Sequence, residues 1–384
     1  MNSFSFTTTK TLINEAGSLQ ALAAHCQSLG IQRPLIVTDQ GIVGAGLLSK
    51  LETVIEASTL KHAVYADVIA DPPESIVLAA LDAAKQHNAD GVIGFGGGSS
   101  MDTAKLIALL ANSDEQLSDI YGVDQVKGTR LPLILIPTTA GTGSEVTAVA
   151  IITTGETTKA GVVSPVLLPD VALLDAELTL GLPAHVTAAT GIDAMVHAIE
   201  AFTSAHKKNP YSDMLAKEAL RLMGDNIVTA VKDGSNLEAR QNMLLGACMA
   251  GQAFANAPVA AVHALAYPLG GHFHIPHGLS NSLVLPHVLR FNASAATPLY
   301  AELCDVLLPS NGCDSEGEKT DALIGYLEDL INTVGLPATL KEAGVSEESL
   351  TTLASDAMLQ QRLLVNNPRE VSESDALAIY QAAF

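Results

Sequence analysis

The sequence predicts two domains: an α/β domain with a doubly wound parallel sheet over residues 1–183, and an all-helical domain over residues 184–384. Short apolar runs alternate with amphipathic helical stretches as far as Asp175, and this order is typical of parallel strands covered by helices. From Pro183 onward strand-like runs disappear and long stretches rich in alanine and leucine follow. A chain of 384 residues is long enough to build two hydrophobic cores.

The α/β half can be followed element by element, because glycine, proline or polar residues bound each apolar run. A run such as Pro34–Thr38 is apolar at nearly every position, as expected of a parallel strand buried on both faces. The expected strands are Phe4–Lys10, Pro34–Thr38, His62–Val68, Gly91–Phe95, Leu131–Ile136 and Val171–Asp175, with a hairpin of Ala148–Thr154 and Lys159–Val163. The expected helices are Ser18–Leu29, Leu47–Glu56, Ser75–Asn88 and one that runs from the glycine-rich segment after Phe95 to Ala111.

The composition argues against several classes of function. The chain has 41 acidic and 20 basic residues and a net charge of −21, which disfavours a nucleic-acid-binding surface or an anchor to an anionic membrane. Its four cysteines form no CxxC pair, so we expect reduced thiols in a cytoplasmic protein. The N-terminus lacks the basic and apolar regions of a signal peptide, and no apolar run is long enough for a membrane helix.

The run Gly96-Gly97-Gly98-Ser99 joins an expected buried strand to the start of a helix. Without Cβ atoms the backbone can approach a ligand closely, and the first turn of a helix offers free N–H groups that suit a phosphate. A tight strand–helix turn that binds no ligand would use the same glycines. The run matches neither the GxGxxG fingerprint nor a P-loop. Its position between a strand and a helix, rather than its exact residue pattern, therefore favours a Rossmann-like nucleotide site.

A second loop of small and hydroxyl side chains, Thr138–Ser144, follows the expected strand Leu131–Ile136. Ligands of doubly wound sheets bind beyond the carboxyl ends of the strands, so two such loops favour a nucleotide over a lone anion. Asp39 also ends a strand, where a carboxylate can accept hydrogen bonds from a ribose and repel a 2′-phosphate, which would select NAD over NADP. Asp39 could equally be an N-cap or turn residue before Gly41.

Asp193 and His197 stand four residues apart in a helical stretch, a spacing that places both side chains on one face. A surface hydrogen bond would explain the pair alone, but small neighbouring residues and two further histidines, His263 and His277, favour a metal site. One carboxylate and three imidazoles suit Fe(II), Zn(II) or Mn(II). Such an ion could lower the pKa of an alcohol, or polarise a carbonyl, while a nicotinamide exchanges a hydride with the carbon.

These segments together resemble the iron-containing (group III) alcohol dehydrogenases, a family that includes lactaldehyde reductase and 1,3-propanediol dehydrogenase. The similar motifs are GGGSSMDTAK from Gly96, PTTAGTGSEVT from Pro137, GIDA and HAIE from Gly191 and His197, HALAYPLGG from His263, and PHG from Pro276. The resemblance runs nearly end to end and includes Asn367-Pro368-Arg369. It implies a nucleotide domain, a helical metal-binding domain, and NAD(P)-linked interconversion of a primary alcohol or small diol and its aldehyde.

The resemblance also implies roles for individual residues. It implies that Fe2+, or Zn2+ in its place, is bound by Asp193, His197, His263 and His277. It implies contacts to NAD(P) from Asp39, Gly97, Gly98, Ser99, Thr138, Thr139, Thr142, Thr147, Val149, Lys159 and Leu178. Relatives often form dimers through their N-terminal strands, so we expect a homodimer joined through Phe4–Lys10.

Two positions depart from the pattern of the family. Many relatives have a histidine four residues after the one that matches His263, and it is thought to help proton transfer; this chain has Tyr267 there. A phenol with an ordinary pKa of about 10 is a weaker proton carrier near neutrality, and His274 is the alternative carrier. Val149 stands where lactaldehyde-reductase-like relatives have an asparagine, so a polar contact to a diol or lactaldehyde is lost.

Other functions stay open from the residues alone. Dehydroquinate synthase and glycerol dehydrogenases share the architecture, so the site could serve a polyol or a phosphorylated substrate; only Lys207, Lys208 and Arg290 lie as basic residues around the metal-site segments. A metal-activated hydrolase would leave the two strand-end loops without a purpose. A purely structural role would leave four convergent ligands unexplained. The prediction is therefore a metal-dependent oxidoreductase that acts on a small alcohol or aldehyde.

Overall fold

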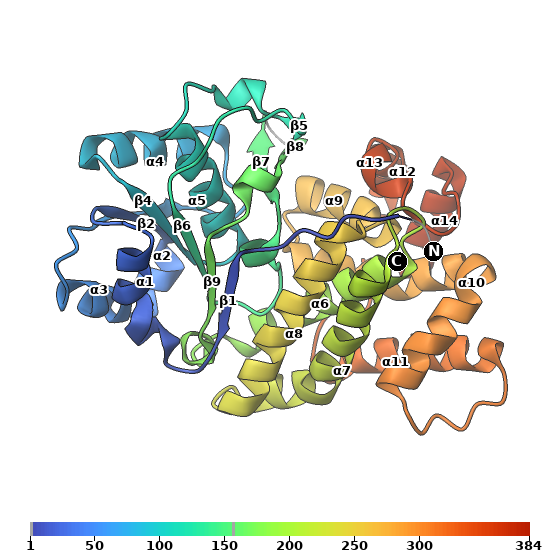
Figure 1. Cartoon of the computed structure of the whole chain (residues 1–384). Coiled ribbons are helices and arrows are strands. Elements are labelled where there is room, and N and C mark those ends of the chain that lie inside the picture. Colours follow the sequence, from blue (N-terminus) through green and yellow to red (C-terminus); the bar gives the residue numbers. More distant parts are fainter. Residues whose placement is uncertain (1–2, 156–157) are drawn as a thin grey trace. The chain divides into compact units, whose positions relative to one another are not determined.

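The computed structural model describes residues 3–155 and 158–384 (Figure 1). These residues form two compact units, Thr7–Gly181 and Leu182–Phe384, and the N-terminal residues up to Phe6 group with the second unit. The first unit contains a six-stranded parallel sheet in the order β1-β9-β6-β4-β2-β3 and a smaller sheet in the order β5-β8-β7.

The elements of the first unit alternate between strands and helices. The strands are β1 (Thr11–Asn14), β2 (Pro34–Asp39), β3 (Ala63–Val68), β4 (Gly91–Gly96), β5 (Gly122–Val123), β6 (Leu133–Pro137), β7 (Val149–Thr154), β8 (Thr158–Val163) and β9 (Val171–Leu174). The α-helices are α1 (Leu22–Ser28), α2 (Gln40–Gly44), α3 (Leu47–Glu56), α4 (Glu74–His87) and α5 (Gly98–Leu110). Short 3-10 helices are η1 (Ser18–Ala21), η2 (Leu117–Asp119), η3 (Ser144–Val146), η4 (Pro165–Leu167) and η5 (Ala176–Thr179). The expected hairpin is confirmed, because β7 and β8 pair antiparallel.

The main sheet is buried on both faces, because alternate residues of its central strands enter different cores. Ile36 of β2 belongs to a buried cluster with Leu22 of α1 and Leu51 of α3. Its neighbour Leu35 belongs to another cluster with Ile107 of α5. A sheet with helices on both faces and parallel strands throughout is the predicted doubly wound fold.

The expected strand Phe4–Lys10 is wrong, because β1 begins only at Thr11. The strand β1 pairs with β9 from Thr11 opposite Val171 onward. Upstream of Val171 stands Pro169, which has no N–H to donate to a ladder, so pairing stops there. Thr9 instead donates its hydroxyl to the carbonyl oxygen of Pro169 at 2.8 Å, and a side-chain contact replaces the strand.

The second unit is helical from Ala184 to its end, as predicted. Its helices are α6 (Ala184–Thr203), α7 (Pro210–Lys232), α8 (Leu237–Asn256), α9 (Ala261–Phe273), α10 (His277–Leu307), α11 (Glu316–Thr333), η6 (Glu347–Ser349), α12 (Leu350–Ala357), α13 (Gln361–Leu364) and α14 (Glu373–Ala383). Across the described residues no single helix is both long and apolar enough to cross a membrane; α8 and α9 reach that length and composition only together, with a bend of 106° between them.

Candidate active site

Helix α6 carries Asp193 and His197 on its buried face, where the two residues are 2% and 4% exposed. The helix packs closely on its neighbours at Gly191. A Cβ at Gly191 would come within 2.9 Å of side-chain atoms of Ile227 in α7 and Met243 in α8. The polar pair is therefore enclosed by protein, and the interpretation as a surface hydrogen bond is wrong.

Two more helices bring histidines to this face of α6. His263 lies in the first turn of α9, and His277 is the first residue of α10. A close approach at Gly278 places the second of them, because a Cβ there would lie 2.3 Å from the carbonyl oxygen of Ala189 in α6. Only glycine lets α10 begin so close to α6, and His277 thereby reaches Asp193.

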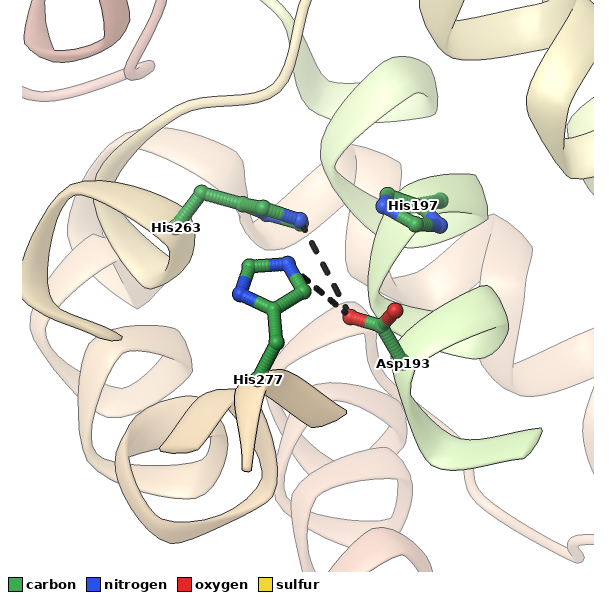
Figure 2. Close-up of side chains that lie close together, drawn as sticks. All are labelled: Asp193, His197, His263 and His277. Carbon is green, nitrogen blue, oxygen red and sulfur yellow. Dashed lines mark ion pairs between the residues drawn. The ribbon is translucent and has the colours of Figure 1, made fainter. Parts of the chain in front are cut away.

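The four predicted metal ligands point toward one another (Figure 2). Each of Asp193, His197, His263 and His277 offers one ligand atom, and these atoms all lie within 4.8 Å of one another. The Nε2 atoms of His263 and His277 lie 4.0 and 3.7 Å from Asp193 Oδ1. Atoms this close can share one ion at bond lengths of about 2 Å after small side-chain shifts.

The protonation states of these side chains also fit a cation. Burial lowers the pKa of His263 well below its ordinary value, and the neighbouring histidines lower it further, so the imidazole is neutral. Burial acts to raise the pKa of Asp193, but the three histidines and Asn281 outweigh burial and hold this pKa below its ordinary value. A neutral imidazole and an ionised carboxylate are the forms that bind metals. Moreover, Asn281 Oδ1 is buried without a hydrogen-bond partner among the described residues, which points to a bound group.

Glu200 is a functional residue that the sequence reasoning did not single out. Its Oε2 lies 2.6 Å from His263 Nδ1, and its Oε1 accepts the N–H of Val262 at 2.6 Å. A carboxylate on Nδ1 fixes the imidazole with Nε2 turned toward the cluster, which is the usual support of a metal-bound histidine. Helical spacing could have revealed Glu200, because it stands three residues after His197 on the same helix.

Asn281 is a second residue that the sequence reasoning missed. Its side chain is fully buried, and its Nδ2 donates to Asp193 Oδ1 at 2.5 Å. The same nitrogen lies 3.3 Å from the Nε2 atoms of His263 and His277. Asn281 stands four residues after His277 in α10, so helical spacing could have revealed it.

The two proposed proton carriers lie in different surroundings. The ring of Tyr267 lies 5.9 Å from the ring of His277, beside the cluster. Arg362 Nη2 donates to the hydroxyl of Tyr267 at 3.5 Å. His274 is exposed and is the C-cap of α9, with a φ of 55°. Tyr267 is therefore the better placed of the two.

The glycine run and the second loop meet at the ends of neighbouring strands. Strands β4 and β6 pair side by side, and the N–H of Thr138 donates to the carbonyl oxygen of Gly96 at 3.0 Å. A Cβ at Gly98 would lie 2.9 Å from Thr142 Cγ2, and one at Gly97 would lie 3.8 Å from Thr139 Oγ1. Two segments that are far apart in the sequence thus form one small-residue surface at the start of α5.

Asp39 is the N-cap of α2, as one of the two interpretations expected. Its Oδ1 accepts the N–H of Ile42 at 3.1 Å, and its Oδ2 accepts the hydroxyl of Ser100 at 3.0 Å. The carboxylate is therefore fixed at the end of β2 and connected to α5. Each oxygen keeps a lone pair that a ribose hydroxyl could use.

A buried lysine connects α5 to other residues expected to contact the nucleotide. Lys105 is 0% exposed and donates to Val149 O at 2.7 Å and to Thr147 Oγ1 at 3.2 Å. Asp102 Oδ1 accepts from Lys105 at 3.2 Å and from the hydroxyl of Ser144 at 2.6 Å. Asp102 and Lys105 were quoted only as part of a motif in the sequence analysis, and their buried ion pair could not be foreseen from it.

Lys159 and Leu178 lie outside the two loops. Lys159 stands on β8 and forms an ion pair with Asp71 at 2.5 Å. Leu178 is 3% exposed and packs in the core cluster that also contains Leu19 and Val54. Their predicted contacts to a nucleotide stay predictions, as does that of Ser99, which is partly buried in the first turn of α5.

Comparison with known proteins agrees with this geometry. The family model for iron-containing alcohol dehydrogenase matches residues 9–176, and the model for the C-terminal part of the Fe-containing alcohol dehydrogenase family matches residues 187–384. The chain is 42% identical over 371 residues to long-chain-alcohol dehydrogenase 1 of Geobacillus thermodenitrificans, with 96% of this chain and 93% of that protein covered.

Two solved structures are similar over their whole length. A crystal structure of 1,3-propanediol oxidoreductase matches with a TM-score of 0.96 and 33% identity, covering 100% of both chains. Sulfoacetaldehyde reductase from Bifidobacterium kashiwanohense, in complex with NAD+, matches with a TM-score of 0.89 and 29% identity, covering 100% of this chain and 99% of that one. The resemblance inferred from the motifs is confirmed, and the chain belongs to the iron-containing alcohol dehydrogenase family.

Proposed function

We propose that this protein uses Fe2+ and NAD(H) to interconvert a primary alcohol or small diol and its aldehyde. The observation that carries the proposal is the buried cluster of one carboxylate and three imidazoles, with its ligand atoms within 4.8 Å of one another, in a chain of this family. Bound there, Fe2+ would act as a Lewis acid on the oxygen of the alcohol or aldehyde.

The residues of the chain prepare the site in distinct ways. Asp193 supplies the negative charge of the ligand set, and Asn281 holds its Oδ1 by a hydrogen bond. Glu200 accepts from His263 and keeps the Nε2 of that ring toward the other ligands. Because these side chains are buried and already held in place, they need little reorganisation when a substrate binds.

NAD(H) is the hydride carrier in this proposal. The related sulfoacetaldehyde reductase of known structure contains NAD+, which supports the choice of a nicotinamide cofactor. The start of α5 and the loop after β6 offer backbone N–H groups and hydroxyls at the strand ends, where a pyrophosphate would bind. The carboxylate of Asp39 disfavours a 2′-phosphate, so NAD is proposed over NADP.

Tyr267 is the proposed proton carrier, in preference to His274. Its phenol ring neighbours His277, whereas His274 is exposed at the end of α9. Tyr267→Phe should slow alcohol oxidation, and His274→Ala should change its rate little. The opposite result would assign the proton transfer to His274.

A cytoplasmic homodimer completes the proposal. Phe4 and Phe6 lie with their rings 5.8 and 5.6 Å from that of Tyr211, and Phe4 and Tyr211 are 40% and 55% exposed. An exposed aromatic group next to an N-terminal segment suits association between copies. The described cysteines are free thiols, which fits a reducing compartment. Light scattering of the wild-type protein and of a Phe4→Ser, Tyr211→Ser variant would test the dimer.

The proposed activity is tested by following NADH formation. The protein is loaded with Fe2+ under anaerobic conditions and offered a panel of primary alcohols and diols, with chelator-treated protein as control. His263→Ala should lose both the bound metal and the activity but keep its affinity for NADH, measured by nucleotide fluorescence. If loaded wild-type protein oxidises none of these alcohols, the proposal is wrong.

A further inference from the structure

The metal cluster is more open at one ligand than at the others. The side chains of Asp193 and His263 are each 3% exposed, whereas the side chain of His277 is 34% exposed. His197 as a whole residue is 4% exposed. Solvent therefore reaches the cluster most readily at His277.

Tyr267 and Arg362 stand on this open side. The Tyr267 ring neighbours the ring of His277 at 5.9 Å, and Arg362 Nη2 lies 3.5 Å from the Tyr267 hydroxyl. Arg362 belongs to α13, which packs against α9, the helix that carries Tyr267 and His263.

The guanidinium of Arg362 is exposed and, among residues 3–155 and 158–384, forms no ion pair. Two of the other basic residues considered near the site are neutralised, since Lys208 pairs with Asp213 and Arg290 pairs with Glu328. In a chain with a net charge of −21, carboxylates are plentiful, so an arginine without one beside the cluster is informative. Its planar fork of N–H donors matches the oxygens of a carboxylate, sulfonate or phosphate.

We propose that Arg362 determines specificity by binding an acidic group of the substrate, so that small aldehydes and alcohols with an oxyanion at the far end are preferred. This inference rests on the proposed function and names its substrate class. The reacting oxygen lies at the metal ligands, the chain passes His277 and Tyr267, and the acidic group pairs with the guanidinium. A charge-assisted, bidentate contact of this kind is about twice as strong as a neutral hydrogen bond.

Two aldehydes with chains of equal length distinguish an effect on binding of the acidic group from an effect on hydride transfer. Succinate semialdehyde carries a carboxylate, and butanal does not. With the Fe2+-loaded protein and NADH, kcat/KM should be higher for succinate semialdehyde. In Arg362→Gln we expect kcat/KM for succinate semialdehyde to fall by about tenfold or more, mainly through a higher KM. The kcat/KM for butanal should change by less than about threefold. Arg362→Lys keeps the positive charge but lacks the planar guanidinium. Its kcat/KM for succinate semialdehyde should lie between those of the wild-type protein and Arg362→Gln.

A binding measurement that needs no turnover gives the second readout. In calorimetry without NAD(H), the loaded wild-type protein should bind γ-hydroxybutyrate more tightly than butanol, and Arg362→Gln should lose this difference. Arg290→Gln is the matched control, because it removes an exposed arginine that pairs with Glu328 instead.

The possible failures can be told apart. If the wild-type protein reduces neither aldehyde, the proposed function is wrong and this inference falls with it. If butanal is reduced but Arg362→Gln slows both aldehydes equally, or the wild-type protein prefers butanal, the role of Arg362 is refuted while the dehydrogenase activity stands.

Discussion

Glu200 Oε2 and His263 Nδ1 lie 2.6 Å apart, in two side chains that are both buried. Through this contact α6 fixes a third predicted ligand, which lies on another helix, in addition to the predicted ligands Asp193 and His197 that α6 carries itself. Burial raises the pKa of Glu200 to about 7, although N–H donors from the start of α9 act to lower it. Burying a carboxyl group is energetically unfavourable. Its presence beside His263 Nδ1 therefore indicates that the orientation of His263 matters.

Glu200→Gln should weaken metal binding without unfolding the protein. The oxygen of the amide can still accept the N–H of Val262, but its nitrogen donates a hydrogen bond where His263 needs an acceptor at Nδ1. The proton of the imidazole then lies on Nε2, the atom that faces the other ligands. We expect a loss of about 10–100-fold in metal affinity, measured by competition with a chelator. Glu218→Gln is the matched control, since Glu218 lies on an exposed surface and pairs with Arg221. Equal affinities in both variants would contradict the role of Glu200.

Gly278→Ala should disturb the metal site through the backbone. The new Cβ would lie 2.3 Å from the carbonyl oxygen of Ala189, which cannot rotate away, so α10 must shift from α6. We expect a destabilisation of about 1–3 kcal/mol together with a lower metal content. At Gly325, in α11, a Cβ would meet no described atom within 4 Å, so Gly325→Ala should gain up to about 1 kcal/mol. Thermal unfolding and metal analysis of both variants would check this contrast.

Cys26 should be inert toward thiol reagents in the folded protein. Burial, with the charge of Asp90 in addition, raises the pKa of its thiol to about 12, so the reactive thiolate is absent near neutrality. Cys313 is partly exposed and should react first. Above the ordinary pKa of 9.0 the unfolded chain releases this proton and the folded chain does not, so folding stability should fall from there toward pH 12. Rapid labelling of Cys26 itself in a Cys313→Ser variant, located by peptide mass spectrometry, would contradict this expectation.

The sheet could be predicted from the sequence because its central strands are apolar throughout. Strands β2, β4 and β6 are buried on both faces, so local composition identifies them. The segment Phe4–Lys10 has β-branched residues as well, but a strand needs a partner. Pro169 lies opposite this segment and cannot pair with it as a strand partner. Which residue lies there depends on the topology of the whole sheet.

Spacing along one helix predicted only part of the metal site, and His263 and His277 were expected from their own segments and from the family resemblance. Asp193 and His197 reveal themselves by spacing, and Glu200 would have followed from the same rule. His277 reaches them through the close packing of Gly278 on α6, which no local pattern contains. Arg362 lies 95 residues from Tyr267, its partner in the structure, and nothing in the sequence connects the two.

Lys105→Met should weaken nucleotide binding while leaving the metal site intact. Burial lowers the pKa of Lys105, but Asp102 and Glu145 raise it, and the ammonium connects α5 to Thr147 and Val149. Its loss leaves Asp102 without a counter-charge, for which we expect about 3–5 kcal/mol of destabilisation and a looser loop around the proposed nucleotide.

The measurements for this variant are the affinity for NADH by fluorescence, the metal content and the unfolding temperature. Lys85→Met, at an exposed position of α4, is the control and should change none of them. Adding Asp102→Asn to Lys105→Met should restore part of the stability, because the uncompensated charge is gone. NADH affinity should stay reduced in the double variant, since the methionine at position 105 cannot donate to Val149 O as the lysine does. Unchanged NADH affinity in a folded Lys105→Met protein would show that the pair supports the core alone.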